Sequence, residues 1–186
     1  MAKVKGTAVS ASVTYLKQRL GEERFAQIVS QMPAAEAGVI RGTVLPSQWY
    51  EFSLLLELMK RAEPHLQSAS GRSLAWEMGR YSAEAGLKTV YKIFFKVADP
   101  GYIIKKASHV FSNYYDSGAM EVVDSGPKHA VLRLTGFNQP CPPFCDRLLG
   151  WMERTVELTG AKGVVMSHPE CLSRGDDCCK YRGEWT

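Results

Sequence analysis

The chain has 186 residues, of which 45% are apolar and 23% charged, so it can bury a core of ordinary size and general disorder is excluded. The net charge of +4 is spread along the chain, and we expect no nucleic-acid partner. Apolar runs such as Leu54–Leu56 are too short to span a membrane and the N-terminus lacks a secretory signal, which predicts a cytoplasmic protein.

The N-terminal third of the chain is predicted to be helical. Val13–Leu20 and Glu22–Met32 carry apolar residues at helical spacing and are separated by a glycine. Pro33–Gly38 is predicted to be a loop. Ser47 is predicted to cap a helix whose wide apolar face covers Trp49–Met59.

Further helices are expected in the middle of the chain, over Ser73–Ala85, Leu87–Val97 and Gly101–Tyr115. The pattern then changes to short runs rich in β-branched residues, which predict strands at Met120–Asp124 and His129–Thr135.

The last part of the chain contains a helix and two more strands. The helix Pro142–Thr159 carries an apolar stripe, and the strands are Val164–His168 and Cys179–Trp185. The order of helices, hairpin, helix and hairpin predicts an α+β fold with an antiparallel sheet covered by helices. We expect residues 1–40 to form an N-terminal helical segment and residues 41–186 the main domain.

All five cysteines lie in the last quarter of the chain. Since cytoplasmic thiols stay reduced, this grouping favours metal ligands or free thiols over disulfides. Cys145 lies in the first turn of its helix, His168 and Cys171 are three residues apart, and Cys179 opens the last strand. Three thiols and one imidazole match the ligands that Zn²⁺ prefers in closed structural sites. We therefore predict a Cys₃His zinc site at these residues.

Other interpretations of the cysteines stay open at this point. Buried cysteines also serve as small apolar side chains, with His168 then a surface residue. An iron–sulfur cluster is a second alternative, but the fourth candidate ligand is a histidine, which such clusters use less often than cysteine. A catalytic cysteine is a third alternative, although the sequence shows no general base that would activate its thiol. We predict no role for Cys141 and Cys178, although Cys178 could substitute for its neighbour Cys179.

The end of the chain resembles the C-terminal signature of the 4-vinyl reductase (V4R) domain. The similar stretches are Cys145–Trp151 (CDRLLGW) and His168–Tyr181 (HPECLSRGDDCCKY). This domain belongs to a superfamily shared with haem-NO-binding sensors and the Bet3-type subunits of the TRAPP complex. A closer resemblance, from about Gly38 to Trp185, is to a paralogous family abundant in myxobacteria. That resemblance also rests on Leu45–Tyr50 (LPSQWY), Thr89–Phe94 (TVYKIF), Tyr114–Gly118 (YYDSG) and Leu134–Phe137 (LTGF).

The resemblance implies a dimer with a ligand cavity between the helices and the sheet. In V4R-type phenol sensors, a zinc ion is held by three cysteines and one carboxylate, and His168 stands here at the carboxylate position. The His and Trp that contact phenol in those sensors are replaced by Lys96 and Asp124, which makes phenol an unsuitable ligand. The Y-x-S-x-R motif of haem-NO sensors is absent, and we expect His109 to be a solvated helix residue.

Aromatic side chains are concentrated between residues 76 and 115. A pocket formed by some of them would suit a small hydrophobic or aromatic molecule, although aromatic residues at helical spacing more often form a core or a dimer interface. The candidate ligand-binding residues are Trp76, Tyr81, Phe94, Tyr114 and Tyr115.

These observations predict a zinc-stabilised, homodimeric sensory domain that binds a small molecule and acts through a signalling partner. One alternative is a protein-interaction scaffold of TRAPP type without a ligand. A second alternative is an enzyme of reductase type. We expect no enzyme, because the sequence contains neither a dinucleotide-binding fingerprint nor an acid–base constellation.

Overall fold

A computed structural model describes residues 1–66, 70–90 and 100–186 of the chain. The first half contains β1 (Lys3–Lys5), α1 (Gly6–Leu20), α2 (Glu22–Ser30), α3 (Ala34–Arg41), β2 (Trp49–Glu51), α4 (Phe52–Ala62), the short 3₁₀ helix η1 (Glu63–His65) and α5 (Leu74–Val90). The second half contains α7 (Pro100–Lys105), α8 (Ala107–Tyr114), β3 (Ala119–Gly126), β4 (His129–Thr135), α9 (Pro142–Leu158), β5 (Val165–Glu170), the 3₁₀ helix η2 (Leu172–Arg174) and β6 (Cys179–Glu184).

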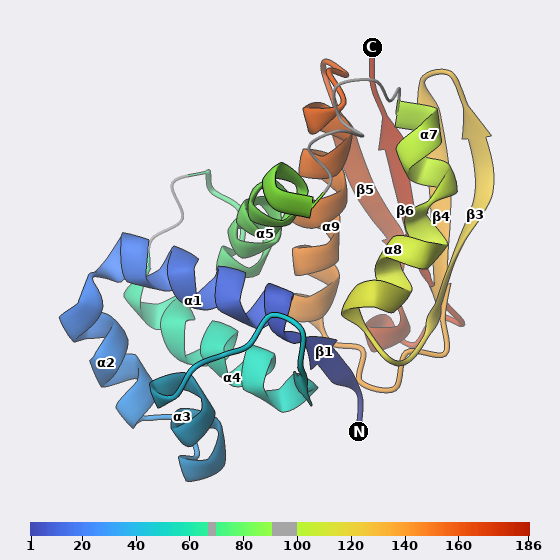
Figure 1. Cartoon of the computed structure of the whole chain (residues 1–186). Coiled ribbons are helices and arrows are strands. Elements are labelled where there is room, and N and C mark those ends of the chain that lie inside the picture. Colours follow the sequence, from blue (N-terminus) through green and yellow to red (C-terminus); the bar gives the residue numbers. More distant parts are fainter. Residues whose placement is uncertain (67–69, 91–99) are drawn as a thin grey trace.

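The elements form a helical part and a sheet part, as Figure 1 shows. Helices α1 to α4 gather on one side, the four-stranded sheet with α7 and α8 lies on the other, and α5 and α9 run between them. The predicted α+β class with an antiparallel sheet covered by helices is confirmed. No helix in the described ranges has the length and apolar character needed to cross a bilayer.

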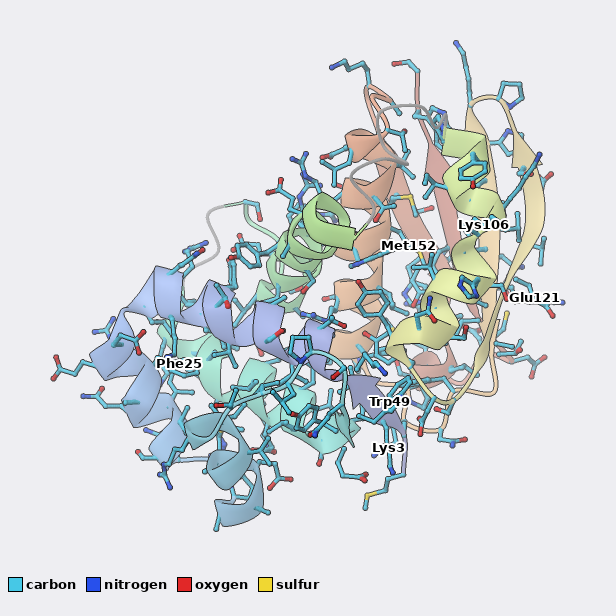
Figure 2. All side chains as sticks on the ribbon, viewed as in Figure 1. Lys3, Phe25, Trp49, Lys106, Glu121 and Met152 are labelled. Carbon is cyan, nitrogen blue, oxygen red and sulfur yellow. The ribbon has the colours of Figure 1, made fainter. Side chains whose placement is uncertain are left out.

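The sheet has the order β3-β4-β6-β5, and all its pairs are antiparallel. Its inner face is apolar: Leu132 pairs with Tyr181, and both are buried under the helices. On its outer face, Glu121 and Arg133 form an ion pair of 2.8 Å. Figure 2 shows Glu121 at the outer edge and Met152, on α9, inside the molecule. Such a sheet, with one buried and one solvated face, explains the alternating pattern of its strands.

Both edge strands of the sheet are irregular. The register of β3 against β4 shifts between Val122 and Asp124. The register of β5 against β6 shifts between Ser167 and Glu170, a stretch that contains Pro169. Each edge is therefore bent by a bulge-like step.

Helices α5 and α9 pack unusually closely against each other. A Cβ atom on Gly79 would lie 2.1 Å from the carbonyl oxygen of Arg147, and one on Gly150 would lie 2.2 Å from that of Trp76. Only glycine tolerates these approaches, because real Cβ contacts essentially never fall below 3.0 Å. The two helix backbones are thus in contact at both points.

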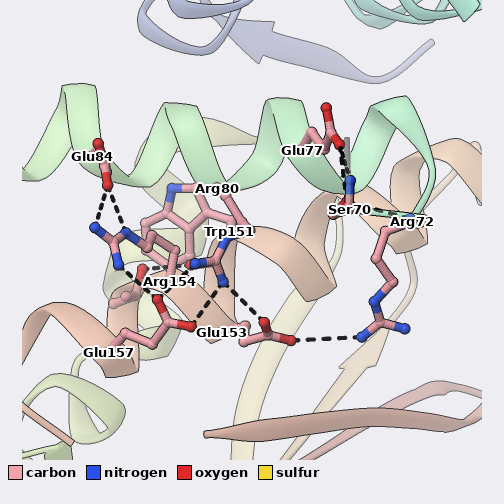
Figure 3. A network of polar contacts seen from close by, with 10 residues as sticks. Ser70, Arg72, Glu77, Arg80, Glu84, Trp151, Glu153, Arg154 and Glu157 are labelled. Atoms are coloured by element: carbon pink, nitrogen blue, oxygen red, sulfur yellow. Dashed lines mark hydrogen bonds and ion pairs between the residues drawn. The ribbon is translucent and has the colours of Figure 1, made fainter. Parts of the chain in front are cut away.

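Ion pairs fasten the same two helices, as Figure 3 shows. Arg80 on α5 donates to Glu153 at 2.9 Å and to Glu157 at 2.7 Å, both on α9. Arg154 on α9 pairs in turn with Glu84 on α5 and with Glu157. The charges along this contact are therefore paired with one another.

The N-terminal segment is tied to the rest of the chain. Strand β1 pairs with β2, and the backbone N–H of Phe52 donates to the carbonyl of Ala2 at 2.9 Å. Phe52 packs edge-to-face on Phe137 and Phe144, which are stacked with ring centroids 4.1 Å apart. The division into residues 1–40 and 41–186 stays a prediction.

The boundaries of several elements differ from the sequence prediction. Pro33–Gly38, predicted to be a loop, lies largely in α3, because Pro33 has the φ of a helix start and is followed by good helix formers. Helix α1 begins at Gly6 and not at Val13, since its first buried positions carry small residues that weaken the apolar pattern. Ser47 is not a cap, because a short strand precedes α4 and Glu51 occupies the N-cap position.

Two predicted helix breaks are also misplaced. Helix α5 continues through Gly86, where a break was expected, and a Cβ there would meet the hydroxyl of Tyr114 at 2.7 Å. The single helix predicted over Gly101–Tyr115 is two helices, α7 and α8, with Lys106 between them. The predicted helix Leu87–Val97 falls largely outside the described residues.

Candidate metal centre and adjoining cavities

Four side chains from the last quarter of the chain meet at the start of α9. Cys145 lies in the first turn of this helix, which begins at a Pro-Pro pair, and His168 lies in β5. Cys171 follows β5 directly, and Cys179 opens β6. Gly175 makes the left-handed turn that returns the chain to β6, with φ of 94°. The cluster therefore joins one helix to two strands.

The donor atoms of this cluster are close enough to bind one ion. The Sγ atom of Cys145 lies 3.4 Å from that of Cys171 and 3.9 Å from that of Cys179. The sulfurs of Cys171 and Cys179 are also 3.9 Å apart, and all four donor atoms lie within 4.8 Å of one another. Zn–S bonds of about 2.3 Å in a tetrahedron place sulfurs about 3.8 Å apart. The spacing of the thiols thus suits tetrahedral zinc.

Neighbouring groups hold the donors in place. The backbone N–H of Leu172 donates to the sulfur of Cys179 at 3.4 Å, and the Asp176 carboxylate accepts the N–H of Cys171 at 2.6 Å. The ring of His168 stacks on that of Tyr181 with an interplanar angle of 2°. Its Nε2 atom is buried and has no hydrogen-bond partner among the described residues. A metal ion would satisfy this nitrogen.

The metal-free cluster favours a single thiolate. A hydrogen bond from the Cys145 thiol, together with the N–H of Leu172, lowers the pKa of Cys179. The same hydrogen bond and burial raise the pKa of Cys145. A cation would then displace the protons of the remaining thiols on binding.

The other two cysteines lie outside this group of donors. Cys178 is buried and donates to the carboxylate of Glu170 at 3.4 Å. Cys141 occupies the position just before α9, where burial raises its pKa. Neither belongs to the cluster formed by the four predicted ligands.

Two small apolar cavities lie between α8, α9 and the sheet. The first has a volume of about 60 Å³ and the second about 50 Å³. They share a wall formed by Ala107, Val110, Leu132, Trp151 and Met152. Cavities of this size hold a few atoms, whereas pockets for drug-sized ligands span roughly 300–1,000 Å³.

The structure brings only some of the predicted aromatic residues to these cavities. Tyr114 and Tyr115 line the first. Trp76 and Tyr81, both on α5, line neither cavity. Trp76 packs under the guanidinium of Arg80, and Tyr81 packs against Tyr15 of α1. Phe94 lies outside the described residues. Trp151, which lines both cavities, was not predicted.

An arginine of the first cavity also escaped the sequence analysis. Arg147 on α9 is only 2% exposed. It donates to the hydroxyl of Ser82 at 2.6 Å and to the carbonyl of Ala8 at 3.3 Å, while its Nη1 atom has no partner among the described residues. The only available signal was its place next to the apolar stripe of the helix.

Solved structures of similar fold are H-NOX proteins. An H-NOX protein from S. oneidensis in the Fe(II)NO state has a TM-score of 0.74 at 13% identity and covers 98% of this chain and 99% of its own. The unliganded Fe(II) H-NOX protein from K. algicida has a TM-score of 0.69 at 13% identity, with 98% and 96% covered. The chain shares the H-NOX fold.

A third solved structure of this fold is an oxygen-binding H-NOX domain related to soluble guanylate cyclases. Its TM-score is 0.71 at 11% identity, and the match covers 98% of this chain and 95% of that one. No protein-family model and no curated protein matches the sequence. At this identity, the similarity establishes the fold alone.

The described residues do not fit the haem that this fold suggests. No histidine lines either cavity within the described residues, and His109, the candidate on α8, is exposed. The cavities, of about 60 and 50 Å³, are also far too small for a porphyrin. We therefore do not extend haem binding to this chain.

Proposed function

We propose that this protein is a small-molecule-binding sensory domain of V4R type, stabilised by a structural zinc ion. The observation that carries the proposal is the convergence of four soft donors, from a helix and two strands, within 4.8 Å. The chain spacing of these donors matches the V4R zinc signature, with a histidine in place of the carboxylate. Relatedness to the paralogous myxobacterial family is part of this proposal.

The zinc ion would have a mechanical role. Four protein ligands leave no open position for water or substrate, so the metal stabilises the fold and performs no chemistry. It would tie the first turn of α9 to β5 and β6. For this reason we propose no enzymatic reaction.

The ligand-binding part of the proposal rests on the two apolar cavities beneath α8. The H-NOX proteins of similar fold bind NO or oxygen. In this chain, tyrosine side chains and an apolar wall suit a small hydrophobic molecule instead. The V4R resemblance implies a homodimer, and because a binding domain needs an output, we propose that it signals through a separate partner protein.

Metal analysis and native mass spectrometry of the purified full chain test the proposal. We expect one zinc ion per chain, a dimer, and release of zinc by a strong chelator with a lower melting temperature. Protein that is folded and free of metal, with a melt unchanged by chelator, would contradict the zinc site.

A scaffold of TRAPP type is the second candidate, and the small volume of the cavities favours it. In that case, their space would be packing irregularity and no small molecule would bind. Native mass spectra without any retained or added ligand, together with capture of a defined protein partner, would support the scaffold.

A further inference from the structure

Arg147, which lines the first cavity, is a buried arginine without a counter-charge. Arg147 is 2% exposed, and no carboxylate within the described part of the chain pairs with it. Its hydrogen-bond acceptors, the Ser82 hydroxyl and the Ala8 carbonyl, are both neutral. The neighbouring Tyr115 is also neutral, since burial raises the pKa of its hydroxyl. A buried charge in such surroundings is strongly destabilising unless a partner arrives.

Two half-buried arginines of this region show what an ordinary structural role looks like. Arg80 and Arg154 lie at the contact of α5 and α9, and each pairs with two glutamates. Arg147 lies two turns before Arg154 on the same helix and also reaches α5, where it donates to the Ser82 hydroxyl, but it lines the first cavity and has no glutamate partner among the described residues. The fold therefore supplies anions where arginine only joins helices, and none at the cavity.

We propose that Arg147 binds the carboxylate of a short aliphatic acid whose tail fills the two apolar cavities. This inference rests on the proposed ligand-binding function and names the class of ligand. A guanidinium presents paired N–H donors that match a carboxylate, and the Nη1 atom of Arg147 is free to donate.

The size of the cavities selects the shape of the tail. An engineered cavity of roughly 150 Å³ holds a benzene ring. The two cavities here, of about 60 and 50 Å³, are each too small for a ring, but they share a wall. In the proposed binding mode, a narrow alkyl chain would extend from the first cavity past Trp151 and Met152 into the second, whose lining includes Met166 and Trp185.

Binding of hexanoate and of its neutral analogue hexanamide to the zinc-loaded full chain tests the proposal. Tryptophan fluorescence, to which Trp151 and Trp185 in the cavity linings contribute, reports binding, and calorimetry gives the affinity. We expect hexanoate to bind about 10- to 100-fold more tightly than hexanamide, since hydrogen bonds to charged groups contribute about 1.5–3 kcal/mol. Acetate, which lacks the tail, should bind more weakly than hexanoate.

Variants test whether the preference for hexanoate over hexanamide depends on Arg147. Arg147→Met keeps the length of the side chain and should remove the preference for hexanoate, whereas Arg147→Lys should retain part of it. Arg182→Met removes an exposed charge from β6 and should leave the preference unchanged. The comparison of acid and amide uses the wild-type protein, so it remains valid if Arg147→Met does not fold.

The outcomes separate this inference from the proposed function. Equal binding of hexanoate and hexanamide would overturn the carboxylate site and leave a ligand-binding domain for neutral molecules. Absence of binding by both would overturn the inference and also remove support for the sensory function. A preference for hexanoate that survives in Arg147→Met would place the carboxylate elsewhere and overturn the assignment to Arg147.

Discussion

The two sides of helix α9 are built in different ways. Towards α5, glycines bring the backbones into contact, and the arginines and glutamates pair with one another. Towards α8 and the sheet, the helix faces two cavities and a cluster of thiols with an unpartnered imidazole, and Arg147, which donates to Ser82 on α5, lines the first cavity without a counter-charge among the described residues. The first side is complete within the protein. The second presents groups that a metal ion and a ligand would complete.

This difference separates a structural role from a binding role on a single helix. Close packing and paired charges leave nothing for an added molecule to satisfy. Unpartnered buried groups raise the free energy of the folded state, and fold stability elsewhere must offset them. The comparison can be tested by variants that damage either side.

The largest effect is expected from the thiol cluster. Cys179→Ser removes a proposed zinc ligand that is fully buried; if the proposed site holds zinc, the variant should bind none and its melting temperature should fall by about 10 °C or more. Metal analysis and a thermal melt measure both changes. The neighbouring Cys178→Ser is the matched control and should keep the zinc, with a shift within about 2 °C. Equal behaviour of the two variants would refute the assignment of the ligands.

A smaller but clear effect is expected on the closed side. Gly79→Ala puts a Cβ atom 2.1 Å from a backbone oxygen of α9, and the helices must move apart. We expect a loss of about 3 kcal/mol in the free energy of unfolding, measured by chemical denaturation. Gly38→Ala in α3 has no atom within 4 Å and should instead gain up to about 1 kcal/mol. An unchanged free energy of unfolding in Gly79→Ala would contradict direct backbone contact between α5 and α9.

The smallest effect concerns two glutamates of α9. Although burial opposes it, hydrogen bonds from Arg80 and Arg154 lower the pKa of Glu157, so its carboxylate stabilises the fold above its unfolded pKa of about 4.3. That contribution is lost as the pH falls through the lowered, folded pKa. Burial raises the pKa of Glu153, so its charge is disfavoured by folding.

At pH 7, Glu157→Gln should therefore lower the free energy of unfolding by up to about 1 kcal/mol, while Glu153→Gln should be close to neutral. At a pH below the lowered pKa of Glu157, where this carboxylate is protonated in the folded wild type as well, both variants should approach the wild type. Denaturation at the two pH values measures the difference. A larger loss for Glu153→Gln at pH 7 would contradict the described balance of charges.

Much of the sheet part could be predicted from the sequence. The strands at His129–Thr135 and near Cys179 have regular alternation, and the apolar stripe of the last helix is long enough to fix its inward face. The four residues of the candidate metal site could be named because their side-chain chemistry is rare and their spacing is compact. Whether they hold zinc stays a proposal.

The features that escaped prediction depend on tertiary contacts. Strands β1 and β2 have three residues each, too few for a periodic pattern. The end of α5 could not be located because Gly86 breaks most helices but here faces a tyrosine hydroxyl. The place of Arg147 next to the apolar stripe is too weak a signal, since arginine is mostly exposed and only the three-dimensional packing shows that it is enclosed.

The irregular edges of the sheet restrict how copies of this protein can associate. An edge strand that is flat and regular offers a row of free backbone groups to a neighbouring chain. Here the shift near Val122 and the shift around Pro169 interrupt that row on both edges. These shifts disfavour an arrangement in which two copies continue the sheet from one molecule into the next. The same irregularity protects the folded protein from fibre-like aggregation.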